Sequence, residues 1–403
     1  MHHLHLTYAV LGTSGVVLAL ASRRVRRWPL SEPLVALLLG VALGPHLLGV
    51  VDLPAERRDL LLLEGSRLLL AWSVTAAALR FPAHELRALV RPALLLLAVV
   101  MPLSALLGGA AALLTGLPLA AALLVGACLC PTDPVLAASV VSGDLAESTL
   151  PARLRQVLTV ESGANDGLAL PLVALALAAV LPQESAGSAV AGLLQEVLVG
   201  TAVGLAAGWM AGRGLRLASG RQALGDGPRL VFTLLLAVAV LGVARVLGGD
   251  GVLAAFVAGL AYNRLVPDSD RSPQDAVDEA VNRYAVLPLF LLLGAVLPWG
   301  GWLDLGPGAL AFAALVLLVR RLPVVLALSR PLGLRGRDAL FAGWFGPMGV
   351  SALFYLAHSL HRGVQDPRVF AAGTLAVAVS VVAFGVSASP LTRLYGRTGE
   401  RAR

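Results

Sequence analysis

The chain consists mainly of long apolar segments separated by short polar loops. Most segments approach the length of about 20 residues that a transmembrane helix needs to cross a bilayer. The pattern therefore predicts an all-α polytopic membrane protein with about thirteen transmembrane helices. The predicted segments lie near residues 6–22, 29–49, 60–80, 90–113, 118–141, 153–181, 188–212, 228–247, 250–263, 284–299, 307–329, 337–360 and 369–390.

The basic residues support this division of the chain. All 31 of them are Arg, and most lie in the loops after odd-numbered segments or in the C-terminal tail. Loops after even-numbered segments hold few, namely Arg57, Arg58, Arg362 and Arg368. Cytoplasmic loops of membrane proteins are enriched in Lys and Arg. The alternation predicts an N-terminus outside and a C-terminus in the cytoplasm.

The composition excludes an ordinary soluble domain, because 58% of the residues are hydrophobic and only 14% are charged. A net charge of +7 could indicate a nucleic-acid partner, but the arginines are spread over many short loops. Membrane topology explains them better, so we expect the lipid bilayer as partner and no nucleic acid. The Ala-, Leu-, Gly- and Arg-rich usage is typical of a GC-rich prokaryotic genome, which favours a bacterial inner membrane (a plasma membrane). No cofactor is indicated.

Two stretches of the fifth and sixth segments carry carboxylates inside apolar sequence. Asp133 lies between Pro131 and Pro134, so the fifth helix is predicted to be interrupted there. Glu161 and Asp166 lie on the sixth segment. Ionisable side chains at membrane depth are costly and usually functional. The two stretches together predict a site for a monovalent cation and a proton.

A second interruption is predicted near 344–353, where Gly346, Pro347 and Gly349 break the twelfth segment. The two interrupted segments are seven apart, and an odd offset gives them opposite orientations in the membrane. Paired Gly/Pro-interrupted segments in two inverted repeats indicate the binding site of a secondary transporter. Segments four to six would then be mirrored by segments eleven to thirteen.

Other classes of membrane protein fit less well. A cation channel needs a polar pore lining, and no segment has repeated polar residues. An intramembrane protease needs a nucleophile with its base or a metal motif, and neither a Ser-Lys pair nor HExxH occurs. A sensor predicts an added soluble domain, for which no stretch of the chain is available. We therefore expect a secondary transporter and no enzyme.

Several motifs resemble those of the cation:proton antiporter superfamily, in its sodium/proton exchanger branch with an Asn-Asp pair. They are PTDPVLAASVV (131–141), ESGANDG (161–167), DGVLAAFVAGLAYN (250–263), VRRLPVVLAL (319–328) and LFAGWFGPMGVSALFY (340–355). Together they look closest to the fungal plasma-membrane antiporters and their bacterial relatives. The resemblance implies exchange of Na+ or Li+ for H+. A K+-preferring antiporter is the alternative, because hard oxygen ligands would serve either ion.

The resemblance implies roles for residues at matching positions. Asp166 would be the main carboxylate for the cation and the proton. Asp133 would be the second acidic ligand of the alkali cation, with the Thr132 carbonyl and Ser162 completing the site. Asn165 stands where the electrogenic bacterial branch has a second aspartate, and it would hold the crossing helices together. Such a site is usually associated with one-for-one exchange.

The resemblance also implies a buried ion pair between Glu161 and an arginine of the eleventh segment. Arg320 and Arg321 are both available, and Arg321 is preferred, with Arg320 nearer the lipid interface or a polar cavity. Many exchangers carry a further arginine where this chain has Met348, a difference that the fungal-type members share. Asp250 is a secondary candidate ligand, although a helix cap at the membrane edge is the stronger interpretation.

The family architecture implies a division into scaffold and transport units. Residues 1–84 would form scaffold and dimerisation helices, and 85–182 a core with the first interrupted helix. Residues 183–304 would contain a linker helix and further scaffold helices, 305–392 the rest of the core, and 393–403 a cytoplasmic tail. The resemblance further implies a homodimer.

Overall fold

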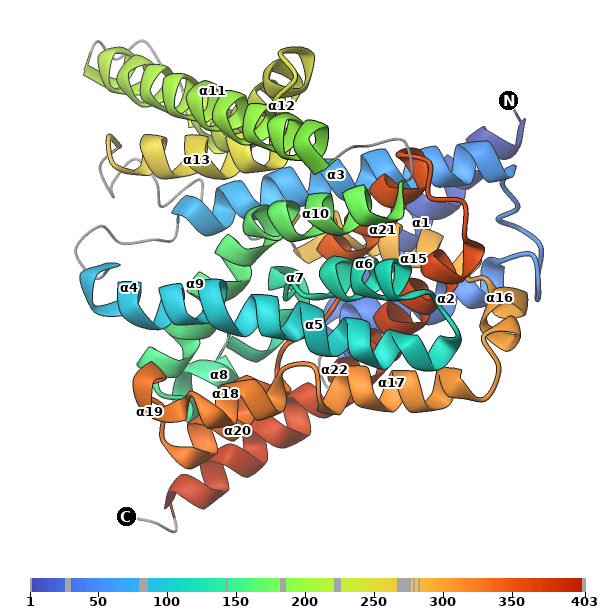
Figure 1. Cartoon of the computed structure of the whole chain (residues 1–403). Coiled ribbons are helices and arrows are strands. Elements are labelled where there is room, and N and C mark those ends of the chain that lie inside the picture. Colours follow the sequence, from blue (N-terminus) through green and yellow to red (C-terminus); the bar gives the residue numbers. More distant parts are fainter. Residues whose placement is uncertain are drawn as a thin grey trace.

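The computed structural model describes residues 2–25, 30–79, 86–141, 144–181, 186–220, 226–266, 277, 280–281 and 283–400. Over these residues the chain forms helices and turns and no strand, as predicted (Figure 1). The first helices are α1 (His2–Val25), α2 (Glu32–Leu43), α3 (Ala55–Leu79), α4 (Leu86–Leu95), a π-helical turn (Leu96–Val100), α5 (Met101–Ala112), a 3-10 turn (Leu113–Thr115), α6 (Leu119–Leu129), α7 (Pro134–Val141), α8 (Asp144–Thr149), α9 (Ala152–Leu168) and α10 (Leu170–Val180). The remaining helices are α11 (Ala186–Gly220), α12 (Asp226–Val246), α13 (Gly251–Asn263), α15 (Leu287–Ala295), α16 (Trp299–Asp304), α17 (Gly308–Leu318), α18 (Leu322–Ala327), α19 (Ser329–Leu332), α20 (Gly336–Trp344), α21 (Val350–His361) and α22 (Pro367–Glu400).

Several of these helices have the length and composition of membrane spans. Six stretches among the described residues are long and apolar enough to cross a bilayer, and five further apolar helices are shorter. The six are Glu56–Leu79, Val90–Thr115, Ala152–Val180, Ala191–Ala218, Gly308–Ala327 and Pro367–Arg397. The all-helical membrane architecture is confirmed, whereas the total of thirteen spans stays a prediction.

Both predicted interruptions are confirmed. The fifth segment is helical to Leu129 and again from Pro134, and the twelfth is helical to Trp344 and again from Val350. Proline explains each break, because it lacks an N–H and clashes with the preceding turn. A third interruption, which the sequence pattern does not predict, separates α17 from α18 at 319–321. These three breaks place free backbone groups inside the protein.

Glycines allow the helices around the breaks to pack closely. A Cβ on Gly126 of α6 would lie 2.1 Å from the carbonyl oxygen of Ala105 in α5. Gly40 of α2 and Gly294 of α15 face each other in the same way, since a Cβ on either would lie within about 2 Å of the other helix's backbone. Such contacts between small residues are typical of helix packing in membranes.

The helices that carry the predicted site lie in the middle of the molecule. In Figure 1, α11, α12 and α13 lie on one side, α17, α18 and α20 lie on the opposite side, and α7 and α9 lie between them. The division into scaffold and core units stays a prediction. The polar connector at 264–283 lies mostly outside the described residues.

Candidate functional site

The two main helix interruptions meet inside the protein. The backbone N–H of Asp133, in the first break, donates to the carbonyl oxygen of Pro347, in the second, at 2.8 Å. Helices α6 and α20 end at this crossing, and helices α7 and α21 begin there. Helix ends carry partial charges of about half an elementary charge, positive at the N-terminus and negative at the C-terminus. The crossing therefore gathers two positive and two negative helix ends.

Asp133 caps both helices that begin at the crossing. Its Oδ1 accepts a hydrogen bond from the backbone N–H of Leu136 at 2.9 Å, and its Oδ2 accepts one from Val350. The side chain is fully buried, and a Cβ on Gly349 would lie 2.4 Å from Oδ2, so only glycine fits there. The negative charge of Asp133 thus lies between two positive helix ends.

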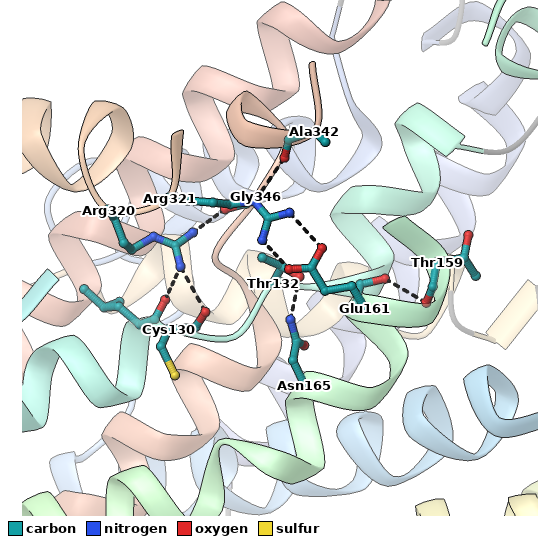
Figure 2. Close-up of polar contacts among 11 residues, drawn as sticks. Cys130, Thr132, Thr159, Glu161, Asn165, Arg320, Arg321, Ala342 and Gly346 are labelled. Carbon is teal, nitrogen blue, oxygen red and sulfur yellow. Dashed lines mark hydrogen bonds and ion pairs between the residues drawn. The ribbon is translucent and has the colours of Figure 1, made fainter. Parts of the chain in front are cut away.

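Arg320 occupies the opposite position, at the helix ends that carry negative partial charge. Its Nη1 donates to the carbonyl oxygens of Leu129 at 2.8 Å and Cys130 at 3.1 Å, and its Nη2 donates to Gly346 (Figure 2). The side chain is only 2% exposed. The expectation that Arg320 lies nearer the lipid interface or a polar cavity is therefore wrong. The break at 319–321 turns this arginine inward, toward carbonyls left free where α6 and α20 end.

Arg321 pairs with Glu161, the partner that the sequence analysis preferred. Arg321 Nη2 donates to Glu161 Oε2 at 2.7 Å, and Nη1 contacts Oε1, so both ends of the carboxylate are bound (Figure 2). Arg321 Nε also donates to the carbonyl oxygen of Ala342 at 3.0 Å. Both side chains are almost completely buried, at 4% and 3% exposure. The two charges of the pair therefore neutralise each other inside the protein.

Asp166 differs from the other buried charges of the crossing. It is fully buried, yet neither of its carboxylate oxygens has a hydrogen-bond partner among the described residues. The neighbouring Asn165 donates from Nδ2 to Thr132 Oγ1 at 2.7 Å, which ties α9 to the first break. The Tyr355 hydroxyl of α21 donates to the backbone carbonyl of Asp166. The helices are thus fixed around Asp166 while its carboxylate stays unpaired.

Three of the other predicted residues line one small cavity. Thr132, Glu161 and Ser162 share it with apolar side chains of α7 and α9 and with Phe345. Ser162 Oγ donates to the carbonyl oxygen of Thr159 at 3.3 Å, which leaves its lone pairs able to face a cation. The cavity is lined mainly by apolar side chains, and these three residues supply its polar groups beside the crossing.

Asp250 lies elsewhere. It caps α13, where its Oδ1 accepts from the backbone N–H of Leu253 at 2.6 Å. It also lines a different cavity, together with Arg67, Glu196, Arg245 and His358. These contacts show a helix cap, and its role as a cation ligand stays a prediction.

Three polar residues near the crossing were not predicted from the sequence. Ser351 and Tyr355 lie on α21, and Ser380 Oγ of α22 accepts from the backbone N–H of Met348 at 2.8 Å. Serines are common in membrane helices, so no pattern in the chain distinguishes these two from the others.

Known proteins resemble this chain in sequence and in fold. The family described as "Sodium/hydrogen exchanger, transmembrane" matches residues 12–394. The chain belongs to this family. Among its relatives within the family, it is 33% identical over 366 residues to Na+/H+ antiporter 2 of Zygosaccharomyces rouxii, covering 87% of this chain and 45% of that protein. It is 27% identical over 270 residues to the K+/H+ antiporter NhaP2 of a Shewanella species, covering 65% of this chain and 45% of that protein.

The fold is shared with a solved exchanger structure. The sodium proton antiporter MjNhaP1 from Methanocaldococcus jannaschii superposes with a TM-score of 0.78 at 18% identity, covering 98% of both chains. At this identity the likeness shows the fold. The chain spans about half the length of the curated relatives named above.

Proposed function

We propose that the chain exchanges Na+ or Li+ for H+ across a membrane by competition at Asp166. The observation that carries the proposal is the balance of charge at the crossing. Asp133 and Arg320 face helix ends of opposite sign, and Glu161 and Arg321 neutralise each other. Asp166 is the one of these buried charges with no partner among the described residues.

An unpaired carboxylate in an apolar interior needs a compensating positive charge. A proton or an alkali cation can supply it, and each excludes the other because both need the same negative group. The neutralised site can cross between the two sides of the membrane, whereas the empty, charged site should not. Since Asn165 carries no charge, one cation should exchange for one proton.

The ligands of the cation would be hard oxygens, which suit alkali ions. We propose Asp166 as the main ligand, with Ser162 and the Thr132 carbonyl beside the small cavity described above. Asp133 was predicted as a second acidic ligand. Its two hydrogen bonds from helix N-termini favour a capping role, through which it keeps positive helix ends from opposing a bound cation.

K+ is the second candidate for the transported cation. The Shewanella relatives named as K+/H+ antiporters favour it. The same oxygen ligands would bind either ion, so the choice depends on the size of the site.

The test is cation-induced dissipation of a pH gradient in vesicles, with Na+, Li+ and K+ added separately. Asp166→Asn should abolish the response to every cation. Asp304→Asn is the matched control, since Asp304 is exposed at the end of α16, and it should respond like the wild type. Full activity in Asp166→Asn would refute the proposal. A cation flow that needs no opposing proton flow would favour a channel instead.

We also propose the topology and assembly of the protein. The distribution of arginines supports a plasma membrane, in a bacterium the inner membrane, with the N-terminus outside and the C-terminus in the cytoplasm. Membership of the exchanger family supports a homodimer built on the scaffold helices. Labelling of cysteines introduced at each terminus would test the orientation, and the mass of the detergent-purified protein would test the dimer.

A further inference from the structure

The crossing contains a group of orphaned oxygens that no contact explains. Both carboxylate oxygens of Asp166, Oδ1 of Asn165 and Oγ of Ser351 are buried and lack hydrogen-bond partners among the described residues. Ser351 is only 1% exposed. Leaving a buried polar atom without a partner is expensive, and native proteins contain few such atoms. Several such atoms close together indicate that a ligand binds there.

The position of Ser351 on α21 aims it at Asp166. Ser351 and Tyr355 are four residues apart and so share one face of the helix. The Tyr355 hydroxyl donates to the backbone carbonyl of Asp166, which holds this face of α21 against α9. One turn earlier, the Ser351 hydroxyl lies beside the Asp166 carboxylate, close enough to interact with it, but the two groups do not meet in a well-formed hydrogen bond.

A serine inside a helix ordinarily satisfies itself locally, by donating to the carbonyl of the preceding turn. Ser359, two turns later on the same helix, does so by donating to the carbonyl oxygen of Tyr355 at 2.7 Å. Ser351 has no such bond. The carbonyl four residues before it belongs to Pro347 and already accepts from the backbone N–H of Asp133. The break in the helix thus leaves the Ser351 hydroxyl for another partner.

We propose that Ser351 Oγ is a direct ligand of the transported alkali cation, opposite the Asp166 carboxylate. This inference rests on the proposed exchange function and adds a ligand that the second interrupted helix supplies. It also predicts selectivity. The attraction between a cation and a ligand falls with distance, so losing this oxygen should weaken Li+ and Na+ more than the larger K+.

The test compares Ser351→Ala with Ser359→Ala, the matched control on the same helix. In proteoliposomes, Ser351→Ala should raise the KM for Na+ by about tenfold, the effect of losing one polar contact to a charged group. The maximal rate should stay within about twofold of the wild type, because the proton still binds Asp166 itself. The KM for Na+ in Ser359→Ala should be unchanged.

Ser351→Thr distinguishes a ligand role of Ser351 from a packing role. It keeps the hydroxyl and adds a methyl group, so a ligand role predicts a KM for Na+ near that of the wild type. A packing role predicts that Thr is worse than Ala. Thermal stabilisation of the purified protein by Na+ gives a readout besides transport, and it should shrink in Ser351→Ala.

Equal KM values for Na+ in Ser351→Ala and Ser359→Ala would overturn the proposal, as would a Thr variant worse than Ala. Either result would leave the exchange function intact if the wild type transports and Asp166→Asn does not. A folded wild type that moves no alkali cation would overturn the exchange function, and this inference with it.

Discussion

Breaking the buried ion pair between Glu161 and Arg321 should cost far more than breaking an exposed ion pair. Both side chains are at most 4% exposed, and the guanidinium binds both carboxylate oxygens. Removing one partner leaves the other charge buried alone, which costs about 3–5 kcal/mol. With an unfolding entropy of about 2.1 cal/mol/K per residue, either Glu161→Gln or Arg321→Gln should lower Tm by about 4–6 °C.

The double variant carries the stronger test. Glu161→Gln with Arg321→Gln removes both charges, so neither is left uncompensated. Its loss of Tm should be clearly smaller than the sum of the two single losses, because residues that act as a unit are not additive. Heat-induced loss of the folded peak in size-exclusion chromatography, measured in detergent, gives all four Tm values. A loss of Tm in the double variant equal to the sum of the two single losses would refute the reasoning.

The pair between Asp366 and Arg368 is a more exposed control. Its closest N–O distance is 2.7 Å, but the side chains are 25% and 40% exposed. Solvent-exposed pairs contribute about 0–1 kcal/mol. Asp366→Asn should therefore lower Tm by about 1 °C or less. A loss as large as that of Glu161→Gln would show that burial does not decide the strength of these pairs.

Four further predictions follow from other contacts. Arg320→Ala should destabilise the protein by about 2–4 kcal/mol, because it frees three buried carbonyls, and Arg320→Lys should recover part of the loss in Tm. Asp133→Ala removes the caps of two helices and should cost about 1–4 kcal/mol, whereas Asp133→Asn keeps one acceptor oxygen and should restore only part of the Tm. Gly126→Ala should reduce the yield of folded protein, since its Cβ would overlap the backbone of α5. Hydrogen bonds from Arg368 hold the pKa of Asp366 below its usual value. The stabilisation that the Asp366 carboxylate provides should therefore be complete above its unfolded pKa of about 3.9. The difference in Tm between the wild type and Asp366→Asn should vanish as the pH falls through the folded pKa of Asp366.

The interruptions could be predicted because their cause is local. Pro131, Pro134 and Pro347 block a continuous helix wherever the chain places them. Their meeting at one crossing followed from the inverted positions of the two segments, and the hydrogen bond from Asp133 to Pro347 confirms the contact. The carboxylates of 133, 161 and 166 were visible for a similar reason, since charge in an apolar segment stands out against its neighbours.

The place of Arg320 could not be predicted in this way. In a continuous helix, adjacent residues point about 100° apart, so only one of two neighbouring arginines would face the core. The family resemblance gave Glu161 an arginine partner, for which Arg321 was preferred, and Arg320 was then expected nearer the lipid interface or a polar cavity. The structure instead has no helix at 319–321, and both arginines turn inward. Pro323 is the signal that could have indicated this third break.

The unwound stretches also explain why the buried charges differ so much in their partners. Each break frees backbone carbonyls or N–H groups, and Arg320 and Asp133 bind these groups as if they were counter-ions. Asp166 lies in the last turn of α9, near the helix end that carries negative partial charge. It therefore has no helix end to neutralise it, and the compensating charge must come from solution. Under the proposed function, this carboxylate is the group at which an alkali cation and a proton compete.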